Sequence, residues 1–589
     1  MALESLKEYL STKYRWIYSE PDRMLCADLA HRHNLPLCLA EVLIKRGISN
    51  DRQISEFFET PLNSLINPFT MKNMETGVAR ISKALKKGEL ICIYGDYDVD
   101  GVTATSLLHM FLKELGADVI HYIPNRLEEG YGLNIDAIEE LARKKVNLII
   151  TVDCGISAAN EVTEAKKLGI DIIITDHHQP GDILPDKATA IINPMQEGDK
   201  YSFKNLSGVG VAFKMCMAVR HTLRQDPEWK LPLPNLKQYL DIVTLGTIAD
   251  VMPLCGENRT FVSHGLYALS SKNVRPGIDE LKKVAGVERQ IVSTSYVGFN
   301  LAPRINAVGR MGDSDRGFRL LTTTDRPEAR RLAAELDQEN KFRQDIEREI
   351  LTEVFKRIED EQMISKRAGL VLYSRNWHPG VLGIVASRVV DKYHRPTIIM
   401  MEEGNGLLKG SARSIPGFHL YNGLKEMSDI LISFGGHKYA AGLKISADKI
   451  NLLQDRFNSV LNERLTERDY TPEINIDAFI EPKELNDTFM AALQKFEPFG
   501  NGNREPVFCM RDVEKYQAVT FVGRDSIHAK CYFIKNGIVF DAIGYDMRAY
   551  ENLFNNEDHF DILFTLSYNV YGKNRSLQLV MKDLRKAVL

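Results

Sequence analysis

Short, almost wholly apolar runs alternate with amphipathic stretches in the first half of the chain. The runs are LICIYGDYD (90–98), VIHYIP (119–124), VNLIITVD (146–153) and IDIIITD (170–176), and the stretches between them have apolar residues at helical spacing. Strands that are apolar throughout are buried on both faces, which is typical of a parallel sheet covered by helices. We therefore predict an α/β domain with a parallel sheet over residues 76–325.

The pattern changes on either side of this domain. Residues 326–362 have apolar positions along one helical stripe and a charged opposite face, which predicts a long connecting helix with a solvated side. Residues 363–458 return to strands and helices and predict a smaller α/β lobe. Residues 459–589 contain short alternating strands, for which an OB-like β-barrel is the natural candidate. Residues 1–75 predict an N-terminal segment of short helices and loops.

Composition narrows the class of protein. The 589 residues are 44% hydrophobic and 26% charged, the usual balance of globular chains, and no apolar run approaches the roughly 20 residues that span a bilayer. The first residues lack the apolar core of a secretory signal. None of the eight cysteines forms a CxxC pair, which argues against a disulfide framework or a structural zinc site and fits a reducing cytoplasm. The net charge of −4 gives no sign of nucleic acid, although a local basic groove is compatible with it.

Acidic residues and histidines follow the predicted parallel strands. The carboxyl ends of strands line the ligand crevice in open α/β sheets, so we expect these side chains to converge. An isolated Asp at a strand end is usually a helix cap or a turn residue, but several such segments in one domain favour a metal site. The candidates are Asp96, Asp98 and Asp100 in GDYDVDG, Asp153 in TVDCG, Asp176, His177 and His178 in TDHH, and Asp250 in GTIADVMP.

The composition of this cluster indicates which ions it would bind. Several carboxylates at short range repel one another by several kcal/mol unless cations lie between them. Carboxylates with one imidazole suit Mn²⁺ or Mg²⁺ better than zinc, which favours thiolate and histidine. We therefore predict a site for Mn²⁺ or Mg²⁺.

The same motifs resemble a known family. DYDVDG, VDCG, TDHH and GTIADV are similar to the four motifs of the DHH phosphoesterases. Further segments resemble the RecJ family of bacterial single-strand-specific exonucleases, and the resemblance runs from about residue 76 to the C-terminus. It implies a DHH catalytic lobe, a DHH-associated second lobe and an OB-like third domain. These segments are GDYDVDGVTA, LAPRINAVGRMG (301–312), HPGVLGIVASR (378–388), GSARS (410–414) and GGHKYAAG (435–442).

The resemblance also implies roles at the metal site. Asp153 would bridge two ions and so take part in catalysis, and His178 would face the scissile phosphate. Related pyrophosphatases carry a histidine where this chain has Tyr94, and Asp96 is the residue expected to compensate as a ligand. The implied metal ligands are Asp98, Asp100, Asp153, His177 and Asp250.

Substrate-binding residues are implied mainly in the second lobe. Adjacent glycines expose backbone N–H groups and Arg presents a planar fork, and both suit a phosphate. The resemblance implies that Ser411 and Arg413 hold a 5′-phosphate and that Arg126 and Arg304 steer the strand. The other candidates are Asn306, His378, Ser414, Gly435, Gly436 and His437.

These observations predict a single-stranded-DNA-specific 5′→3′ exonuclease that releases 5′-mononucleotides by two-metal-ion hydrolysis, in recombination and repair. The alternatives are a DHH-family phosphodiesterase or nanoRNase on short or cyclic nucleotides, and a catalytically dead nucleic-acid-binding scaffold. The intact acidic motifs disfavour the scaffold, and the barrel and length disfavour a short-substrate enzyme. The resemblance implies single-strand-binding protein and a RecQ-type helicase as partners, and we expect a cytoplasmic monomer.

Overall fold

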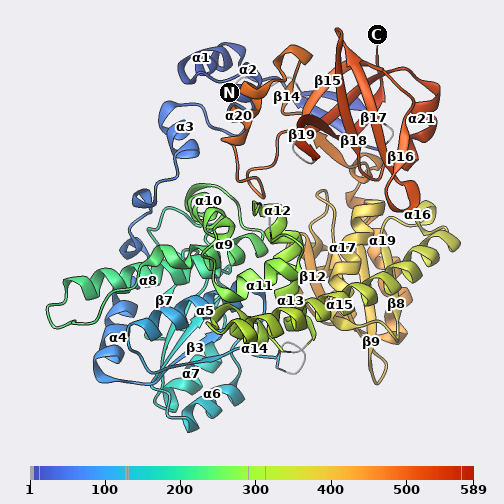
Figure 1. The fold of residues 1–589 in the computed structure, drawn as a ribbon. Helices are drawn as coiled ribbons and strands as arrows, with labels where there is room; N and C mark the ends of the chain where they lie inside the picture. The colour runs from blue at the N-terminus through green and yellow to red at the C-terminus, as the bar shows by residue number, and fades with distance from the viewer. Residues whose placement is uncertain are drawn as a thin grey trace. The chain divides into compact units, whose positions relative to one another are not determined.

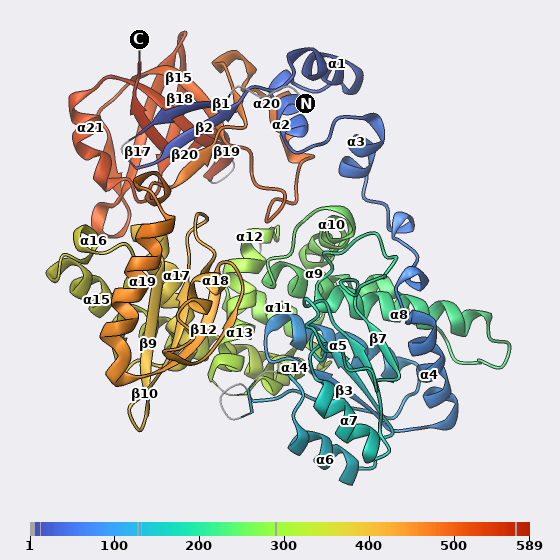
Figure 2. The same ribbon diagram turned by 180° about the vertical axis from the view of Figure 1, so that it is seen from behind.

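The structure is a computed structural model that describes residues 6–11, 13–125, 129–130, 132–288, 291–311, 313–571 and 574–588. The chain forms two compact units. One unit contains Glu59–Asp345 and the short segment Pro498–Arg504. The other contains Met1–Phe58, Ile346–Glu497 and Glu505–Leu589. The ribbon in Figures 1 and 2 is coloured along the chain.

The predicted parallel sheet is confirmed in the first unit. Its strand order is β4-β3-β5-β6-β7, and every neighbouring pair is parallel. Side chains alternate between two cores, because Ile91 and Ile93 of β3 face one apolar cluster and Cys92 and Tyr94 face another. Burial on both faces explains why the central strands are mostly apolar. The strands are β3 Ile91–Gly95, β4 Val119–Tyr122, β5 Leu148–Val152, β6 Asp171–Thr175 and β7 Ala190–Ile192.

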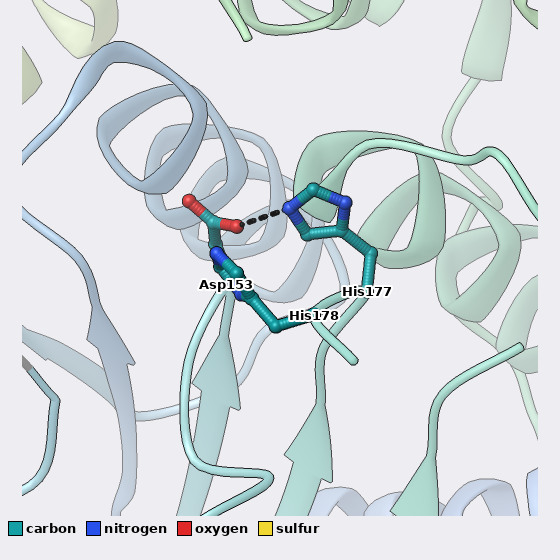
Figure 3. A group of neighbouring side chains, drawn as sticks. All are labelled: Asp153, His177 and His178. Carbon is teal, nitrogen blue, oxygen red and sulfur yellow. Dashed lines mark ion pairs between the residues drawn. The ribbon is translucent and has the colours of Figure 1, made fainter. Parts of the chain in front are cut away.

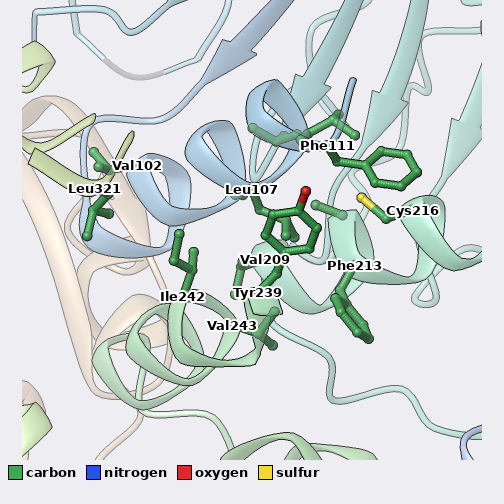
Figure 4. Close-up of a cluster of buried hydrophobic side chains, with 14 of the residues drawn as sticks. Val102, Leu107, Phe111, Val209, Phe213, Cys216, Tyr239, Ile242, Val243 and Leu321 are labelled. Atoms are coloured by element: carbon green, nitrogen blue, oxygen red, sulfur yellow. The ribbon is translucent and has the colours of Figure 1, made fainter. Parts of the chain in front are cut away.

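Helices cover both faces of this sheet. On one face, α6 (Ile135–Arg143) and α7 (Ala159–Lys167) contribute apolar residues to the smaller core. On the other face, α4 (Met74–Lys87), α5, α8 and α9 build the larger core, and Figure 4 shows Phe111, Phe213 and Ile242 among its buried side chains. Residues 99–108 of α5 are all buried, which fixes the start of this helix beside the carboxyl ends of the strands. The bounds are α5 Val99–Glu114, α8 Gly208–Gln225 and α9 Leu240–Ala249.

A helical layer completes this unit. It begins with α10 (Gly256–Ser270) and continues to α14 (Asp315–Thr322). The intervening helices are α11 Pro276–Val284, α12 Thr294–Tyr296, a π-helix at Val297–Leu301 and α13 Ala302–Met311. The long helix predicted over 326–362 is observed as α15, Arg326–Asp360.

The second α/β lobe has the strand order β11-β12-β10-β9-β8. Only the pair β8–β9 is parallel among the pairings that the structure describes in this sheet. Helix α17 (Leu382–Tyr393) packs on β9 and β10, and α16 (Met363–Lys366), α18 (Leu420–Lys425) and α19 (Ile450–Arg464) complete the lobe. The strands are β8 Leu370–Ser374, β9 Thr397–Gly404, β10 Leu407–Arg413, β11 Leu431–Gly436 and β12 Ala440–Ser446.

The C-terminal strands pair in a ring. Around the ring, β15 pairs with β17, β17 with β18, β18 with β20 and β20 with β19. The ring closes because β19 also pairs with β15. This Greek-key ring agrees with the predicted OB-like barrel, although only short pairing joins β15 to β17. The ring is β15 Phe508–Lys515, β17 His528–Lys535, β18 Ile538–Gly544, β19 His559–Tyr571 and β20 Asn574–Lys586, with β14 Ala478–Phe479 and β16 Thr520–Val522 added and α20 Asp487–Gln494 and α21 Glu551–Asn556 beside it.

The prediction for the N-terminal segment is wrong at its start. Residues that we expected in short helices or loops form a hairpin, and its second strand pairs in parallel with β13 (Glu473–Asn475). This pairing joins residues more than 450 positions apart, so no local pattern could indicate it. The elements are β1 Leu6–Leu10, β2 Arg15–Ser19, α1 Arg23–His33, α2 Leu37–Lys45 and α3 Asp51–Phe58.

Candidate metal centre

Acidic residues lie at the carboxyl ends of neighbouring strands of the parallel sheet. Asp96 follows β3, Asp153 follows β5, and Asp176 with the two histidines after it follows β6. Because β5 pairs with both β3 and β6, these strand ends are adjacent. Their predicted convergence is therefore confirmed, at the edge where open α/β sheets bind ligands.

The N-terminus of α5 supplies the next two carboxylates. Asp98 is the N-cap of the helix and accepts a hydrogen bond from the N–H of Gly101 at 3.0 Å. Asp100, in the first turn, accepts hydrogen bonds from the N–H groups of Gly208 (2.6 Å) and Val209 (2.9 Å) at the start of α8. A helix N-terminus favours a negative charge, so α8 stabilises the buried carboxylate of Asp100.

A glycine is required where α8 meets the cluster. A Cβ atom on Gly208 would lie 2.5 Å from the Cβ atom of Asp153. On α9, a Cβ atom on Gly246 would lie 2.8 Å from Oδ1 of Asp100. These two glycines let the helices approach the carboxylates closely.

His177 faces the carboxylates from the end of β6. Its Nε2 atom lies 3.1 Å from Oδ1 of Asp153, 3.6 Å from Oδ2 of Asp250 and 3.8 Å from Oδ2 of Asp100. Figure 3 shows the imidazole edge directed at Asp153. Burial and the neighbouring His178 lower the pKa of His177 to about 4, so the ring is neutral and can offer a lone pair.

The carboxylates destabilise one another in the absence of a cation. Burial and the charges of Asp250 and Asp98 raise the pKa of Asp100 well above its usual value. Burial and Asp100 raise that of Asp153, and burial and Asp98 raise that of Asp250 to about 7. A divalent cation would remove this repulsion, and oxygen ligands with one imidazole suit Mn²⁺ and Mg²⁺, so the residues fit such an ion.

Ligand atoms gather in overlapping groups within the described part of the chain. One group is Asp96, Asp98 and Asp153, a second is Asp100, His177 and Asp250, and a third is Asp153 with both histidines. The ligand atoms of each group lie within 4.8 Å of one another. Asp153 and His177 each belong to two of these groups, and of the two only the carboxylate of Asp153 has two oxygen atoms with which to contact two ions.

His178 differs in its surroundings from His177. Its Nδ1 atom lies 2.7 Å from Oδ1 of Asp176, which also accepts the backbone N–H groups of both histidines. Burial lowers the pKa of His178, but the hydrogen bond and charge of Asp176, together with the charges of Asp250 and Asp100, raise it more, to about 9. Burial raises the pKa of Asp176, but the bond from His178 and the backbone N–H groups hold it below its usual value. Asp176 therefore orients a protonated His178.

Tyr94 turns away from the carboxylates. It lies in the core on the other face of the sheet and stacks on Tyr122 with ring centroids 5.0 Å apart. Its hydroxyl donates a hydrogen bond to the carbonyl of Gly132 at 3.1 Å and accepts one from Asn134. The carboxylate of Asp96, by contrast, lies within the cluster.

A cavity of about 340 Å³ opens beside this cluster. It is lined by Asp96, Tyr97, Asp98, His178, Ala249, Asn306, Gly309 and Arg310. Asn306 Oδ1 accepts the N–H of Val99 at 3.2 Å, and a Cβ atom on Gly309 would lie 2.4 Å from the carbonyl oxygen of Tyr97, so α13 packs tightly on the metal-ligand loop. Arg310 is not among the site residues predicted from the sequence. Arg310 lies four residues after Asn306, on the same face of the helix, and this spacing could have indicated it as a site residue.

Of the two arginines expected to steer the DNA strand, the structure describes only Arg304. Arg304 is largely buried, and its guanidinium lies 2.8 Å from Oδ1 of Asp337 and donates to the carbonyl of Asn300. These contacts join the Arg304 side chain to α15 and to the π-helix, and its role in steering the strand stays a prediction. Arg126 lies outside the described residues.

Ser411 and Arg413 meet at a helix N-terminus in the second lobe. Alternation along β10 places both on its more exposed face, and Nη1 of Arg413 donates to Oγ of Ser411 at 2.9 Å. A Cβ atom on Gly383, near the start of α17, would lie 2.7 Å from Nη2 of Arg413. A guanidinium, a hydroxyl and a helix N-terminus therefore lie together, a combination suited to an anion.

The remaining candidates lie on the edges and turns of the same lobe. Gly435 pairs with Gly442 on the neighbouring strand, and Gly442 pairs in turn with Ser411. The GGHKYAAG and GSARS motifs therefore lie side by side in the sheet. Gly436 and His437 are exposed at the end of β11. Ser414 and His378 have local roles: the hydroxyl of Ser414 donates to the carbonyl of Phe418, and Nδ1 of His378 accepts the N–H of Gly380.

Family models match three parts of the chain. The DHH family, N-terminal domain, matches residues 90–247, the DHHA1 domain matches 366–463, and the RecJ OB domain matches 476–583.

Curated relatives match nearly the whole chain. The single-stranded-DNA-specific exonuclease RecJ of Bacillus subtilis (strain 168) is 38% identical over 575 residues, which cover 98% of this chain and 71% of the relative. The RecJ exonuclease of Escherichia coli (strain K12) is 35% identical over 561 residues, 93% of this chain and 96% of the relative.

Solved structures match as well. The crystal structure of RecJ from Thermus thermophilus in complex with Mn²⁺ has a TM-score of 0.82 at 28% identity, and the match covers 98% of this chain and 80% of that one. The structure of the same protein in complex with Mg²⁺ has a TM-score of 0.75 at 26% identity, covering 98% and 79%.

Proposed function

Because the chain belongs to the RecJ family of single-stranded-DNA-specific exonucleases, we propose that it removes 5′-mononucleotides from single-stranded DNA in the 5′→3′ direction, by metal-dependent phosphodiester hydrolysis. The observation that carries this proposal is the buried cluster of carboxylates around the neutral imidazole of His177. The similarity to relatives over nearly the full chain supports the DNA substrate, and the direction follows the family resemblance.

Two ions, Mn²⁺ or Mg²⁺, would be held by the residues of the cluster. Asp96 and Asp98 would hold one ion, Asp100, His177 and Asp250 the other, and Asp153 would contact both. When bound, two such ions activate water and neutralise charge on a phosphodiester. This assignment uses every carboxylate whose pKa the cluster raises.

Two residues beside the cluster would act on the phosphate. His178 is held protonated by Asp176 and lines the cavity, so its imidazolium can donate a hydrogen bond to a phosphate oxygen. Arg310 lines the same cavity and can add a second charged donor. Asn306 holds α13 against the start of α5 and thereby positions Arg310.

The second lobe would bind the 5′ end of the strand. Ser411 and Arg413 at the N-terminus of α17 offer the donors that a terminal phosphate needs. Gly435, Gly436 and His437 on the neighbouring strand extend this surface with exposed backbone. Arg126, Ser414 and His378 remain candidates for contacts along the strand. The barrel would bind further nucleotides, as OB folds do.

We also propose the cellular setting that the family resemblance implies. The protein would act in recombination and repair in the cytoplasm as a monomer, with single-strand-binding protein and a RecQ-type helicase as partners. In the described part of the chain, no helix has both the length and the apolar character needed to cross a membrane.

One assay separates this function from its alternatives. End-labelled single-stranded DNA, a linear dinucleotide and a cyclic dinucleotide are each incubated with the protein and Mn²⁺. We expect stepwise release of mononucleotides from the 5′ end of the DNA. Cleavage of only the dinucleotides would favour the short-substrate phosphodiesterase, and binding of DNA without cleavage would favour the scaffold.

A further inference from the structure

The turn that follows Asp250 has an unusual backbone. Helix α9 ends at Ala249, and Asp250 is its C-cap. The N–H of Val251 donates to the carbonyl of Ile248 at 3.0 Å, and the N–H of Met252 donates to that of Thr247 at 3.2 Å. These are the paired hydrogen bonds of a Schellman motif, in which the residue after the C-cap adopts a left-handed conformation and is usually glycine.

In this chain that residue is a valine. Val251 has a φ of 55°, and the residue is 66% exposed. A β-branched residue in this region is strained, and no apolar burial of the side chain offsets the strain. Other contacts must therefore hold the turn in the conformation that directs the Asp250 carboxylate towards His177.

A loop from a distant part of the sequence supplies those contacts. The side-chain amide of Asn501 donates to the carbonyl of Val251 at 2.8 Å, and the backbone carbonyl of Asn501 accepts the N–H of Leu254 at 2.7 Å. One residue thus binds both ends of the 251–254 turn. Glycines allow this approach, because a Cβ atom on Gly500 would lie 2.6 Å from Leu254.

The loop is closed by its own hydrogen bonds and is bonded to the same unit. Gly500 and Asn503 exchange backbone hydrogen bonds, and the side chain of Asn503 donates to the carbonyl of Pro498. The hydroxyl of Thr294, at the start of α12, donates to the carbonyl of Phe499 at 2.6 Å. The segment Pro498–Arg504 belongs to the unit of the parallel sheet, and in Figure 1 this orange loop lies by α10 and α12.

We propose that Asn501 is a positioning residue for the metal centre: it stabilises the strained Val251 turn and so fixes the orientation of Asp250. This proposal rests on the proposed function, since it assigns Asn501 a role in holding the metal ion. Residues that orient metal ligands typically change metal affinity 10- to 100-fold when mutated. Because Asn501 acts one residue away from Asp250, we expect an effect near the lower limit, about tenfold.

The test measures Mn²⁺ binding to the full-length protein by calorimetry and by electron paramagnetic resonance, with Tm and exonuclease kcat and KM measured in parallel. Asn501→Ala should weaken Mn²⁺ binding about tenfold at the site that includes Asp250, and should lower kcat at subsaturating Mn²⁺ more than it changes KM for DNA. Thr294→Val is the matched control. It removes a hydrogen bond to the same loop while both hydrogen bonds between Asn501 and the turn remain, so it should change the Kd for Mn²⁺ much less than Asn501→Ala does.

A second variant separates positioning from simple loss of stability. Val251→Gly removes the strain, since glycine adopts the left-handed conformation without steric cost. In the Val251→Gly background, Asn501→Ala should weaken Mn²⁺ binding by less than threefold. Equal effects in both backgrounds, or a lower Tm with an unchanged Kd for Mn²⁺, would overturn the proposal. A wild-type protein that bound no Mn²⁺, or bound it without cutting DNA, would instead count against the proposed function.

Discussion

At the scale of single residues, Asp153 occupies the centre of the site. It lies at the end of the central strand β5, its carboxylate faces His177 at 3.1 Å, and it belongs to more than one ligand group. Burial and the neighbouring carboxylates raise its pKa, and a cation bound nearby would favour its ionised form. The charge on this residue is therefore linked to occupation of the site.

Asp153→Ala should reduce kcat at saturating Mn²⁺ by at least about a hundredfold, because it removes the group expected to contact both ions, and a hundredfold corresponds to about 3 kcal/mol. DNA binding should survive, since phosphate contacts elsewhere supply most of the affinity. Single-turnover cleavage and a DNA-binding titration measure the two effects. Asp136→Ala, an exposed change on α6, is the control, and near-normal turnover of Asp153→Ala would contradict the bridging assignment.

Arg413 provides a second prediction at this scale. A terminal phosphate offers more charge and one more oxygen than an internal phosphodiester, and a charged hydrogen bond contributes roughly 1.5–3 kcal/mol. Arg413→Ala should therefore lower kcat/KM for 5′-phosphorylated strands about ten- to a hundredfold and reduce the preference over 5′-hydroxyl strands. Arg413→Lys should restore only part of this effect, because a point charge lacks the planar fork. Equal losses on both kinds of strand would show a general backbone contact instead.

At the scale of elements, the start of α8 contacts two carboxylates of the metal centre. Its first N–H groups bind Asp100, and its first residue, Gly208, lies against Asp153. The helix dipole and a close glycine contact thus act on two carboxylates at once. A change in the position of this helix alters both.

Gly208→Ala should therefore damage the site. The added methyl group would lie within 3 Å of Asp153, and such overpacking costs about 1–3 kcal/mol. We expect a lower Tm and weaker Mn²⁺ binding, measured by thermal unfolding with and without the ion. Gly210→Ala, two residues farther along the helix, is the matched control: the atom nearest to its Cβ would be Oγ of Ser207 at 3.3 Å, compared with 2.5 Å for the Gly208 contact, and alanine favours a helix. If both variants behaved alike, the contact with Asp153 would not matter.

The elements that the sequence predicted correctly are those specified by local pattern. The strands β3, β5 and β6 are mostly apolar, and their order along the chain was enough to expect Asp96, Asp153 and His177 at their carboxyl ends. Features that depend on distant segments escaped prediction. Arg310 gains its place from the packing of α13 on the Tyr97 loop, and the N-terminal hairpin depends on pairing with β13.

At the scale of the whole molecule, the two ends of the chain share one structural region. Trp16 on β2 is fully buried, and its indole N–H donates to the carboxylate of Asp583 on β20 at 2.6 Å. The same carboxylate accepts hydrogen bonds from Ser11 and Tyr550. The first strands of the chain therefore belong to the core around the barrel.

Trp16→Phe should destabilise this unit. The change keeps an aromatic ring but leaves the buried Asp583 with one donor fewer, which costs about 1.5–3 kcal/mol for a charged acceptor. Urea unfolding should show a lower midpoint, while Mn²⁺ binding in native buffer should stay at the wild-type value. Trp229→Phe, at a half-buried position in the other unit, is the comparison. An unchanged midpoint for Trp16→Phe would contradict the role of this hydrogen bond.

The loop at Pro498–Arg504 determines where the chain can be joined to that of a relative in a chimaeric protein. The segments before and after it belong to one unit, but the loop itself belongs to the other. The boundaries of the barrel along the sequence are therefore not the boundaries of the catalytic unit. A chimaera that exchanged everything after Glu497 would bring a foreign loop to Val251, whereas a junction after Arg504 would keep Asn501 with the turn it binds. Shuffling between relatives should succeed at the second junction more often than at the first.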